Sequence, residues 1–187
     1  MEMEMLEHER QWLIDQGAKM ITALGVKEDN SVIDFGCGKG RYTIPLAQVV
    51  GKNGNVLAIE CDSNEVTLFH KRIAAFDVQG VIKILNSEDV QLHSVDDDTI
   101  DSVFAFDVLQ YVKDWHSFFK SVRRVLKPGG SLHIYPATIP HPEAVDIKRV
   151  AAIINKIDLQ SVGKKTFRMM HNKDMVNGEV YTFILPN

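Results

Sequence analysis

Short apolar runs alternate along the chain with segments whose apolar residues recur every three or four positions. Short runs bounded by turn residues are typical of buried strands, and the wider spacing predicts amphipathic helices. In the first 135 residues we predict strands at 32–34, 55–60, 81–85, 100–106 and 131–135. Helices are expected at 4–24, 42–50, 62–76 and 115–126.

Local signals mark several of these boundaries. Gly17 predicts a break in the first helix, and Asp62 is expected to cap the third. Pro45 requires that its helix begin within a few residues before it. The Lys127-Pro128-Gly129-Gly130 segment is expected to stop the fourth helix.

The last third of the chain changes this pattern. One helix is predicted at 143–158, followed by strands at 165–170 and 180–185, with a hairpin turn signal at Asn177-Gly178. Strands that alternate with helices favour a parallel sheet covered on both faces. The predicted fold is therefore α/β: a doubly wound, mostly parallel seven-stranded sheet with a C-terminal antiparallel hairpin.

Composition narrows the organisation and the partners. A chain of 187 residues with 45% hydrophobic content is expected to form one domain. We divide it into an N-terminal helical segment (1–28), a ligand-binding core (29–135) and a C-terminal helix with a strand pair (136–187). Net charge is −4 and the basic residues occur as scattered pairs, which argues against nucleic-acid binding.

The cysteines and the first residues bear on location. Two cysteines, Cys37 and Cys61, form neither a disulfide framework nor a zinc-ligand pattern, so no metal is expected. Residues 1–10 are acidic and lack the apolar core of a secretory signal, and no apolar run has the length of a membrane span. A reduced, cytoplasmic protein is the expectation.

The most informative stretch follows the first strand, where Gly36, Gly38 and Gly40 come at alternate positions. A strand, a glycine turn and a helix bind nucleotide-like ligands at the carboxyl end of the strand. The dinucleotide fingerprint G-x-G-x-x-G/A requires a small residue where Arg41 stands, so the early Gly40 disfavours a nicotinamide oxidoreductase. An acid at the next strand end, Glu60, has the place expected for a ribose ligand.

From about Asp29 to Tyr135 these residues resemble the class I S-adenosylmethionine-dependent methyltransferases, most closely the ubiquinone/menaquinone C-methyltransferase-like group. The resemblance implies a Rossmann-like methyltransferase fold and S-adenosylmethionine as cofactor. The implied roles are methionine binding by main chain at 36–38, ribose binding by Glu60 and an adenine contact at Asn86-Ser87, where the family often has an acid. The predicted cofactor-binding residues are Asp34, Gly36, Cys37, Gly38, Glu60, Cys61, Asn86, Ser87 and Phe106.

The sequence gives less direct evidence for the residues that bind or deprotonate the methyl acceptor. Asp107, Gln110 and Tyr111 follow the fourth strand, and His141 lies in the loop after the fifth. Asp107, Tyr111 and His141 are the candidate catalytic groups, against the alternative that they only form loop hydrogen bonds. His133 alternates with apolar residues and is expected to be a hydrogen-bonded core histidine.

Two functions from different classes remain. The leading hypothesis is a methyltransferase that moves a methyl group to a small-molecule acceptor by in-line displacement. The alternative is a non-catalytic S-adenosylmethionine-binding subunit with a regulatory or scaffold role. Few residues remain to build a substrate lid, which is compatible with a homodimer whose partner completes the site.

Overall fold

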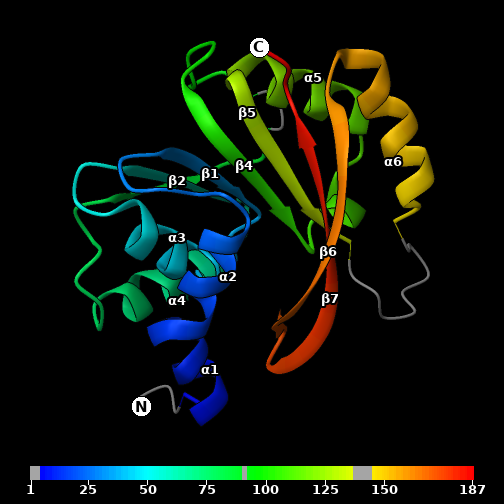
Figure 1. The fold of residues 1–187 in the computed structure, drawn as a ribbon. Coiled ribbons are helices and arrows are strands. Elements are labelled where there is room, and N and C mark those ends of the chain that lie inside the picture. The colour runs from blue at the N-terminus through cyan, green and yellow to red at the C-terminus, as the bar shows by residue number, and fades with distance from the viewer. Residues whose placement is uncertain (1–4, 90–91, 137–144) are drawn as a thin grey trace.

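The computed structural model describes residues 5–89, 92–136 and 145–187, and these residues build one seven-stranded sheet in the order β3-β2-β1-β4-β5-β7-β6 (Figure 1). Its strands are β1 (Ser31–Phe35), β2 (Asn55–Glu60), β3 (Ile82–Asn86), β4 (Ile100–Phe106), β5 (Leu126–Tyr135), β6 (Gln160–His171) and β7 (Asp174–Ile184). The first five strands are parallel, and β7 is antiparallel to both β5 and β6. The predicted fold class is confirmed.

Helices cover both faces of this sheet, as Figure 1 shows. In chain order they are α1 (Glu7–Gln11), the π-helix η1 (Trp12–Gln16), α2 (Gly17–Ala23), α3 (Thr43–Val50), α4 (Ser63–Ile73), η2 (Leu109–Tyr111), α5 (Trp115–Val125), α6 (Ile147–Ile154) and η3 (Asn155–Ile157). No helix among the described residues is both long and apolar enough to cross a membrane.

Two apolar cores result, one on each face. Successive strand residues point to opposite faces, so Val32 and Phe104 join the core under α2, α3 and α4, whereas Ile33 and Val103 join the core under α5 and α6. Strands buried on both faces read as continuous apolar runs. This is why they could be predicted from the sequence to within a few residues.

The break expected at Gly17 is wrong. Helical structure continues from α1 through η1 into α2, and Gly17 is the first residue of α2. A Cβ on Gly17 would lie 2.5 Å from Cγ of Pro45, so the glycine lets the N-terminal helix approach α3 closely.

The turn expected at Asn177-Gly178 is also wrong. Both residues lie inside β7, where Asn177 pairs with Arg168 and Gly178 with Phe167. The chain turns instead between β6 and β7, where Asn172 has a left-handed φ of 52°. A Cβ on Gly178 would lie 2.4 Å from Sδ of Met169, so this glycine serves side-chain packing within the hairpin.

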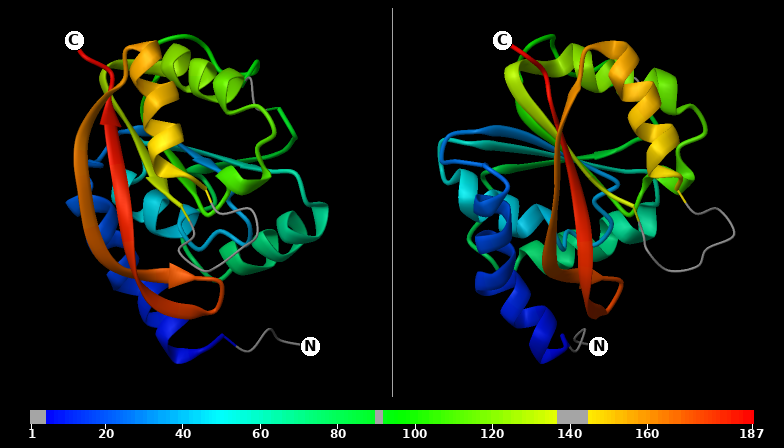
Figure 2. Two further views of the ribbon diagram at one scale, coloured as in Figure 1. Left: turned by 90° about the vertical axis from the view of Figure 1, so that its right-hand side faces the viewer. Right: turned by 45° about the vertical axis from the view of Figure 1, so that its right-hand side comes forward.

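The β6–β7 hairpin is longer than predicted, because β6 begins at Gln160 and β7 at Asp174, each several residues before its predicted start. Both views in Figure 2 show it curving past the sheet toward the N-terminal helices. Contact is made there, since His8 Nε2 lies 2.6 Å from the main-chain oxygen of Lys173. The hairpin tip and the first helix are therefore joined, although they come from opposite ends of the chain.

Two boundaries differ from expectation in the second half. The fourth predicted helix does end before Lys127, but β5 starts at Leu126 and not at residue 131. Helix α6 begins only after Asp146, whose carboxylate accepts hydrogen bonds from the amides of Lys148 and Arg149. Residues 143–144 of the predicted helix lie outside the described residues.

Candidate active site

The three glycines after β1 have positive φ angles, but only one of them faces open space. A Cβ on Gly36 would lie 2.3 Å from Val108 Cγ2, and one on Gly40 would lie 2.2 Å from Phe69 Cε2. A Cβ on Gly38, whose φ is +50°, would meet only Glu65 Oε2 at 3.8 Å. Gly36 and Gly40 thus allow close packing, and Gly38 leaves main chain accessible to a ligand.

Glu60 lies directly against this loop. Its Oε2 accepts a hydrogen bond from the Gly38 amide at 2.9 Å, while Oε1 accepts from the amides of Cys61 and Asp62 at 2.8 and 3.0 Å. The structure therefore brings together the glycine loop and the acid at the end of β2, the two features that the sequence placed in one ligand site.

Asp34 is a buried organiser behind the loop. Thr43 Oγ1 donates a 2.6 Å hydrogen bond to its Oδ2. Burial raises the pKa of Asp34 to about 7, against the lowering effect of the Thr43 hydrogen bond. Burial also raises the pKa of the neighbouring Cys37 thiol, so Cys37 is no nucleophile.

The predicted adenine residues lie beside the end of β2. Asn86 Nδ2 donates to the main-chain oxygens of Glu60 and Cys61 at 2.9 and 3.2 Å, and the Ser87 amide donates to Glu60 O at 3.0 Å. Cys61 is exposed, whereas Phe106 at the end of β4 is buried. Asn86 thus holds the strand end that carries Glu60.

The N-terminal helix is fastened to the glycine loop by contacts that the sequence did not predict. Trp12 Nε1 donates to the main-chain oxygen of Arg41 at 2.8 Å. The buried Glu9 carboxylate forms ion pairs with two arginines: its Oε1 lies 2.8 Å from Arg41 Nε and 3.0 Å from Arg72 Nη2. Two guanidinium groups on one carboxylate fix the first helix against the loop and α4, but their spacing in the sequence gives no signal.

A second group of polar residues gathers after β4. Asp107 has a left-handed φ of 53°, and its amide donates to Tyr135 O at 2.8 Å. Gln110 Nε2 donates to both the main-chain oxygen and Oδ1 of Asp107, at 2.9 and 3.0 Å. His171 Nδ1, from the end of β6, lies 2.9 Å from Asp107 Oδ2. Sequence reasoning missed His171 because it comes from a distant strand.

The other two catalytic candidates are placed differently. Tyr111 is 69% exposed at the end of η2, away from the buried contacts of Asp107. His141 lies outside the described residues. Of the three candidates, Asp107 is the one that the described structure surrounds with fixed polar partners.

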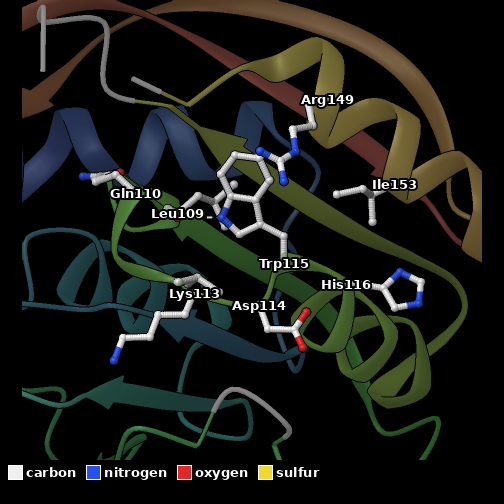
Figure 3. A pocket seen from close by; sticks show the side chains of 9 residues that line it. Leu109, Gln110, Lys113, Asp114, Trp115, His116, Arg149 and Ile153 are labelled. Carbon is white, nitrogen blue, oxygen red and sulfur yellow. Dashed lines mark hydrogen bonds between the residues drawn. The ribbon is translucent and has the colours of Figure 1, made fainter. Parts of the chain in front are cut away.

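A cavity of about 470 Å³ lies beside the same segment (Figure 3). Figure 3 shows the Arg149 guanidinium facing the Trp115 ring, 5.2 Å from its centre, with Gln110 and Lys113 on one side of the ring and His116 on the other. None of its lining residues belongs to the predicted cofactor set. The lining residues are Leu109, Gln110, Val112, Lys113, Asp114, Trp115, His116, Arg149 and Ile153.

Comparison with known proteins identifies the family. The family described as "Methyltransferase domain" matches residues 33–134, more than half of the chain. The chain belongs to this methyltransferase family. The predicted class I S-adenosylmethionine-dependent methyltransferase family is therefore confirmed, and the sheet ends in the predicted antiparallel C-terminal pair.

The relatives of this methyltransferase domain include a demethylmenaquinone methyltransferase from Bacillus subtilis. It is 31% identical over 114 residues, which cover 61% of this chain and 48% of the relative. The chain therefore spans about half the length of the curated relatives it matches.

Solved structures show the same fold at lower identity. A SAM-dependent methyltransferase from Aquifex aeolicus superposes with a TM-score of 0.75 at 22% identity, covering 95% of this chain and 93% of that one. The [4+2]-cyclase SpnF gives a TM-score of 0.73 at 12% identity, covering 95% and 80%. Since a cyclase shares it, the fold alone does not fix the reaction.

Proposed function

We propose that this domain binds S-adenosylmethionine at the carboxyl ends of β1 and β2 and transfers its methyl group to a small molecule held near the end of β4. The observation that carries the proposal is the open main chain of Gly38 in direct contact with the Glu60 carboxylate. Parallel α/β sheets bind nucleotide-like ligands at this edge.

The residues present fit the cofactor. A carboxylate offers about four lone-pair sites, and three amides occupy part of those on Glu60. One lone-pair site on Oε2 remains for one ribose hydroxyl. The second ribose hydroxyl can replace the Gly38 amide as a donor to Oε2. The space that a Cβ on Gly38 would take is available to the methionine portion.

When bound, the cofactor supplies a methyl group attached to a sulfonium sulfur. The sulfur keeps the electron pair of the C–S bond as the methyl group leaves. The acceptor X–H becomes X–CH₃ and releases a proton. The chain's own residues bind and orient. Main chain at 36–38 holds the methionine portion, Glu60 the ribose, and Asn86, Ser87, Cys61 and Phe106 border the nucleoside. Asp34 keeps the loop in shape through Thr43.

The first acceptor to test comes from the relatives, which are named for demethylmenaquinone. We propose a hydroxylated aromatic acceptor of this kind, and reduced demethylmenaquinone with one prenyl unit is a manageable probe. The chain is proposed to act on small molecules and not on nucleic acid, because its basic residues form no run.

Titration calorimetry with S-adenosylmethionine and with its demethylated product tests the binding site. Gly38→Ala is the test variant and Gly25→Ala the matched control, because both positions have positive φ and no close neighbour. Each substitution costs about 1–2 kcal/mol of backbone strain. Only Gly38→Ala places a methyl group in the crevice, so it should weaken cofactor binding at least about tenfold. Equal binding by both variants would refute the site.

The non-catalytic alternative predicts the same binding without turnover. Release of the demethylated cofactor in the presence of reduced, monoprenyl demethylmenaquinone separates the two functions. Tight cofactor binding with no product from this probe or from a panel of phenols, amines and thiols would favour the regulatory subunit.

A further inference from the structure

We propose that His171 positions Asp107 as the proton acceptor of the reaction, so that the acceptor is a molecule that loses a proton when it is methylated. This inference rests on the proposed methyl transfer and names the acceptor class and two residues that act on it. It starts from the contact between a loop aspartate and a histidine supplied by the C-terminal hairpin.

The two side chains differ in exposure. His171 Nδ1 lies 2.9 Å from Asp107 Oδ2, the His171 side chain is 6% exposed and the Asp107 side chain 28%. Asp107 is therefore the member that a bound molecule can reach. His171 stands behind it and acts through it.

The hydrogen bonds select one form of the imidazole. Asn172 Nδ2, which is only a donor, lies 3.0 Å from His171 Nε2. With the Asn172 amide oriented as in the structure, Nε2 is the acceptor, and the tautomer that fits this contact carries its proton on Nδ1. His171 Nδ1 lies 2.9 Å from Asp107 Oδ2 but makes no well-aligned hydrogen bond with any described residue. In the proposed arrangement the ring turns its N–H toward this oxygen, and a donor to a carboxylate stabilises its charged form.

The main chain of Asp107 is held in an uncommon conformation. A left-handed φ costs a residue other than glycine about 1–2 kcal/mol. Three contacts secure it here: the hydrogen bond from its amide to Tyr135 O, and the two that its main-chain oxygen and Oδ1 accept from Gln110. With His171 on Oδ2, the carboxylate is fixed from both sides, as a proton acceptor requires.

The residues that follow Asp107 in the chain contact both the glycine loop and the cavity beside η2. The next residue, Val108, fills the space beside Gly36 in the cofactor loop. Leu109 and Gln110 of η2 line the 470 Å³ cavity, and both are drawn in Figure 3. Asp107 is not itself a lining residue, so the proposed acceptor position is the cavity edge beside Gln110, whose Nε2 donates to Asp107 Oδ1.

The chemistry follows from this placement. Asp107 takes the proton of the acceptor X–H as the new bond from X to the methyl carbon forms, and then releases that proton to solvent. Among the described residues, Tyr42 interacts electrostatically with Asp107, and also with Tyr135, Asp34 and Arg41. Burial raises the pKa of Tyr42 well above its usual value, so its hydroxyl keeps its proton and is no base.

Two substitutions of His171 test the inference. His171→Asn keeps an N–H donor close to the place of Nδ1, and His171→Leu removes it at similar bulk. The control is His93→Leu, which breaks a similar pair with Asp89 whose histidine is 73% exposed. Cooperative thermal unfolding checks that every variant is folded.

The first readout needs no acceptor: ¹³C NMR titration of the Asp107 carboxyl carbon. His171→Leu should raise the midpoint by about one pH unit or more, His171→Asn by clearly less, and His93→Leu not at all. Identical midpoints in all four proteins would overturn the inference. In calorimetry, all three variants should bind S-adenosylmethionine as tightly as the wild type does. If the wild-type protein does not bind it, the proposed function is refuted, but the result of the Asp107 titration still stands.

The second readout is turnover. With reduced, monoprenyl demethylmenaquinone, kcat should fall about 100-fold in His171→Leu and less than tenfold in His171→Asn, and the acid limb of the kcat profile should move to higher pH in His171→Leu. Dimethyl sulfide, a thioether whose sulfur carries no proton, should not be methylated. Equal losses in both His171 variants without a pH shift, or wild-type preference for dimethyl sulfide, would contradict the inference.

Discussion

The two proposed sites are built in different ways in the two halves of the sheet: the cofactor half at β1 and β2, and the acceptor half at β4 and β5. Beside β1 and β2, the site consists of main chain at 36–38 and one carboxylate, Glu60, which contacts the Gly38 amide at a separation of 22 residues. Beside β4 and β5, the proposed site consists of side chains, and His171 from the far end of β6 lies 2.9 Å from Asp107.

This difference bears on how the domain can change its specificity. The cofactor half depends on glycine and on adjacent parallel strands, so most changes there damage packing or binding directly. The acceptor half depends on which side chains the hairpin and the segment after β4 present. It can therefore change its acceptor without altering the cofactor loop, in keeping with a fold that carries both methyltransferases and a cyclase.

The largest effect is expected from Gly36→Ala, which attacks the contact between the two halves. The new Cβ would lie 2.3 Å from Val108 Cγ2 at a φ of +77°. Overpacking and backbone strain together should lower the free energy of unfolding by about 3 kcal/mol, measured by urea denaturation. Adding Val108→Ala should recover part of the loss. No recovery in the double variant would show that Val108 is not the obstacle.

A smaller effect, on binding alone, is expected from Glu60→Ala. One charge-assisted hydrogen-bonding group is lost, so affinity for S-adenosylmethionine should fall by about 2 kcal/mol, roughly 30-fold, in calorimetry. The fold should survive, as circular dichroism can show. The exposed Glu28→Ala is the charge-matched control. Unchanged affinity in Glu60→Ala would place the ribose elsewhere.

The smallest effect concerns His133, in the acceptor half. It is fully buried between Ser131 Oγ at 2.9 Å and Thr182 Oγ1 at 3.0 Å, as predicted for a core histidine, and burial lowers its pKa to about 3. The unfolded chain protonates this ring near pH 6.5 and the folded chain does not, so stability falls as pH drops below about 6.5.

Between pH 6.5 and 5.5 this histidine should account for a loss of about 1 kcal/mol in the free energy of unfolding. Urea denaturation of the wild type and of His133→Gln at both pH values measures it, because the variant lacks the titrating ring. Parallel losses in the two proteins would mean that other groups cause the pH dependence.

Much of the fold was readable from sequence because each strand of the parallel core is buried on both faces. The bounds of β2 and β4 agree with the prediction, and Asp62 caps α4 as expected by accepting from the Asn64 amide at 2.7 Å. The glycines misled twice. In the sequence, Gly17 suggests a helix break and Gly178 a turn. In the structure, each position requires glycine because a side chain packs against it: Pro45 against Gly17 and Met169 against Gly178.

The sequence by itself determined the α/β class and the pairing of the glycine loop with Glu60, because these depend on apolar runs, glycine conformation and neighbouring strands. Only the tertiary structure decided two further contacts: the long hairpin brings His171 to Asp107 at the proposed acceptor site, and the first helix is joined to the glycine loop through Glu9 and Arg41. The physical reason is range: a hydrogen bond between residues far apart in the chain leaves no periodic trace in either segment.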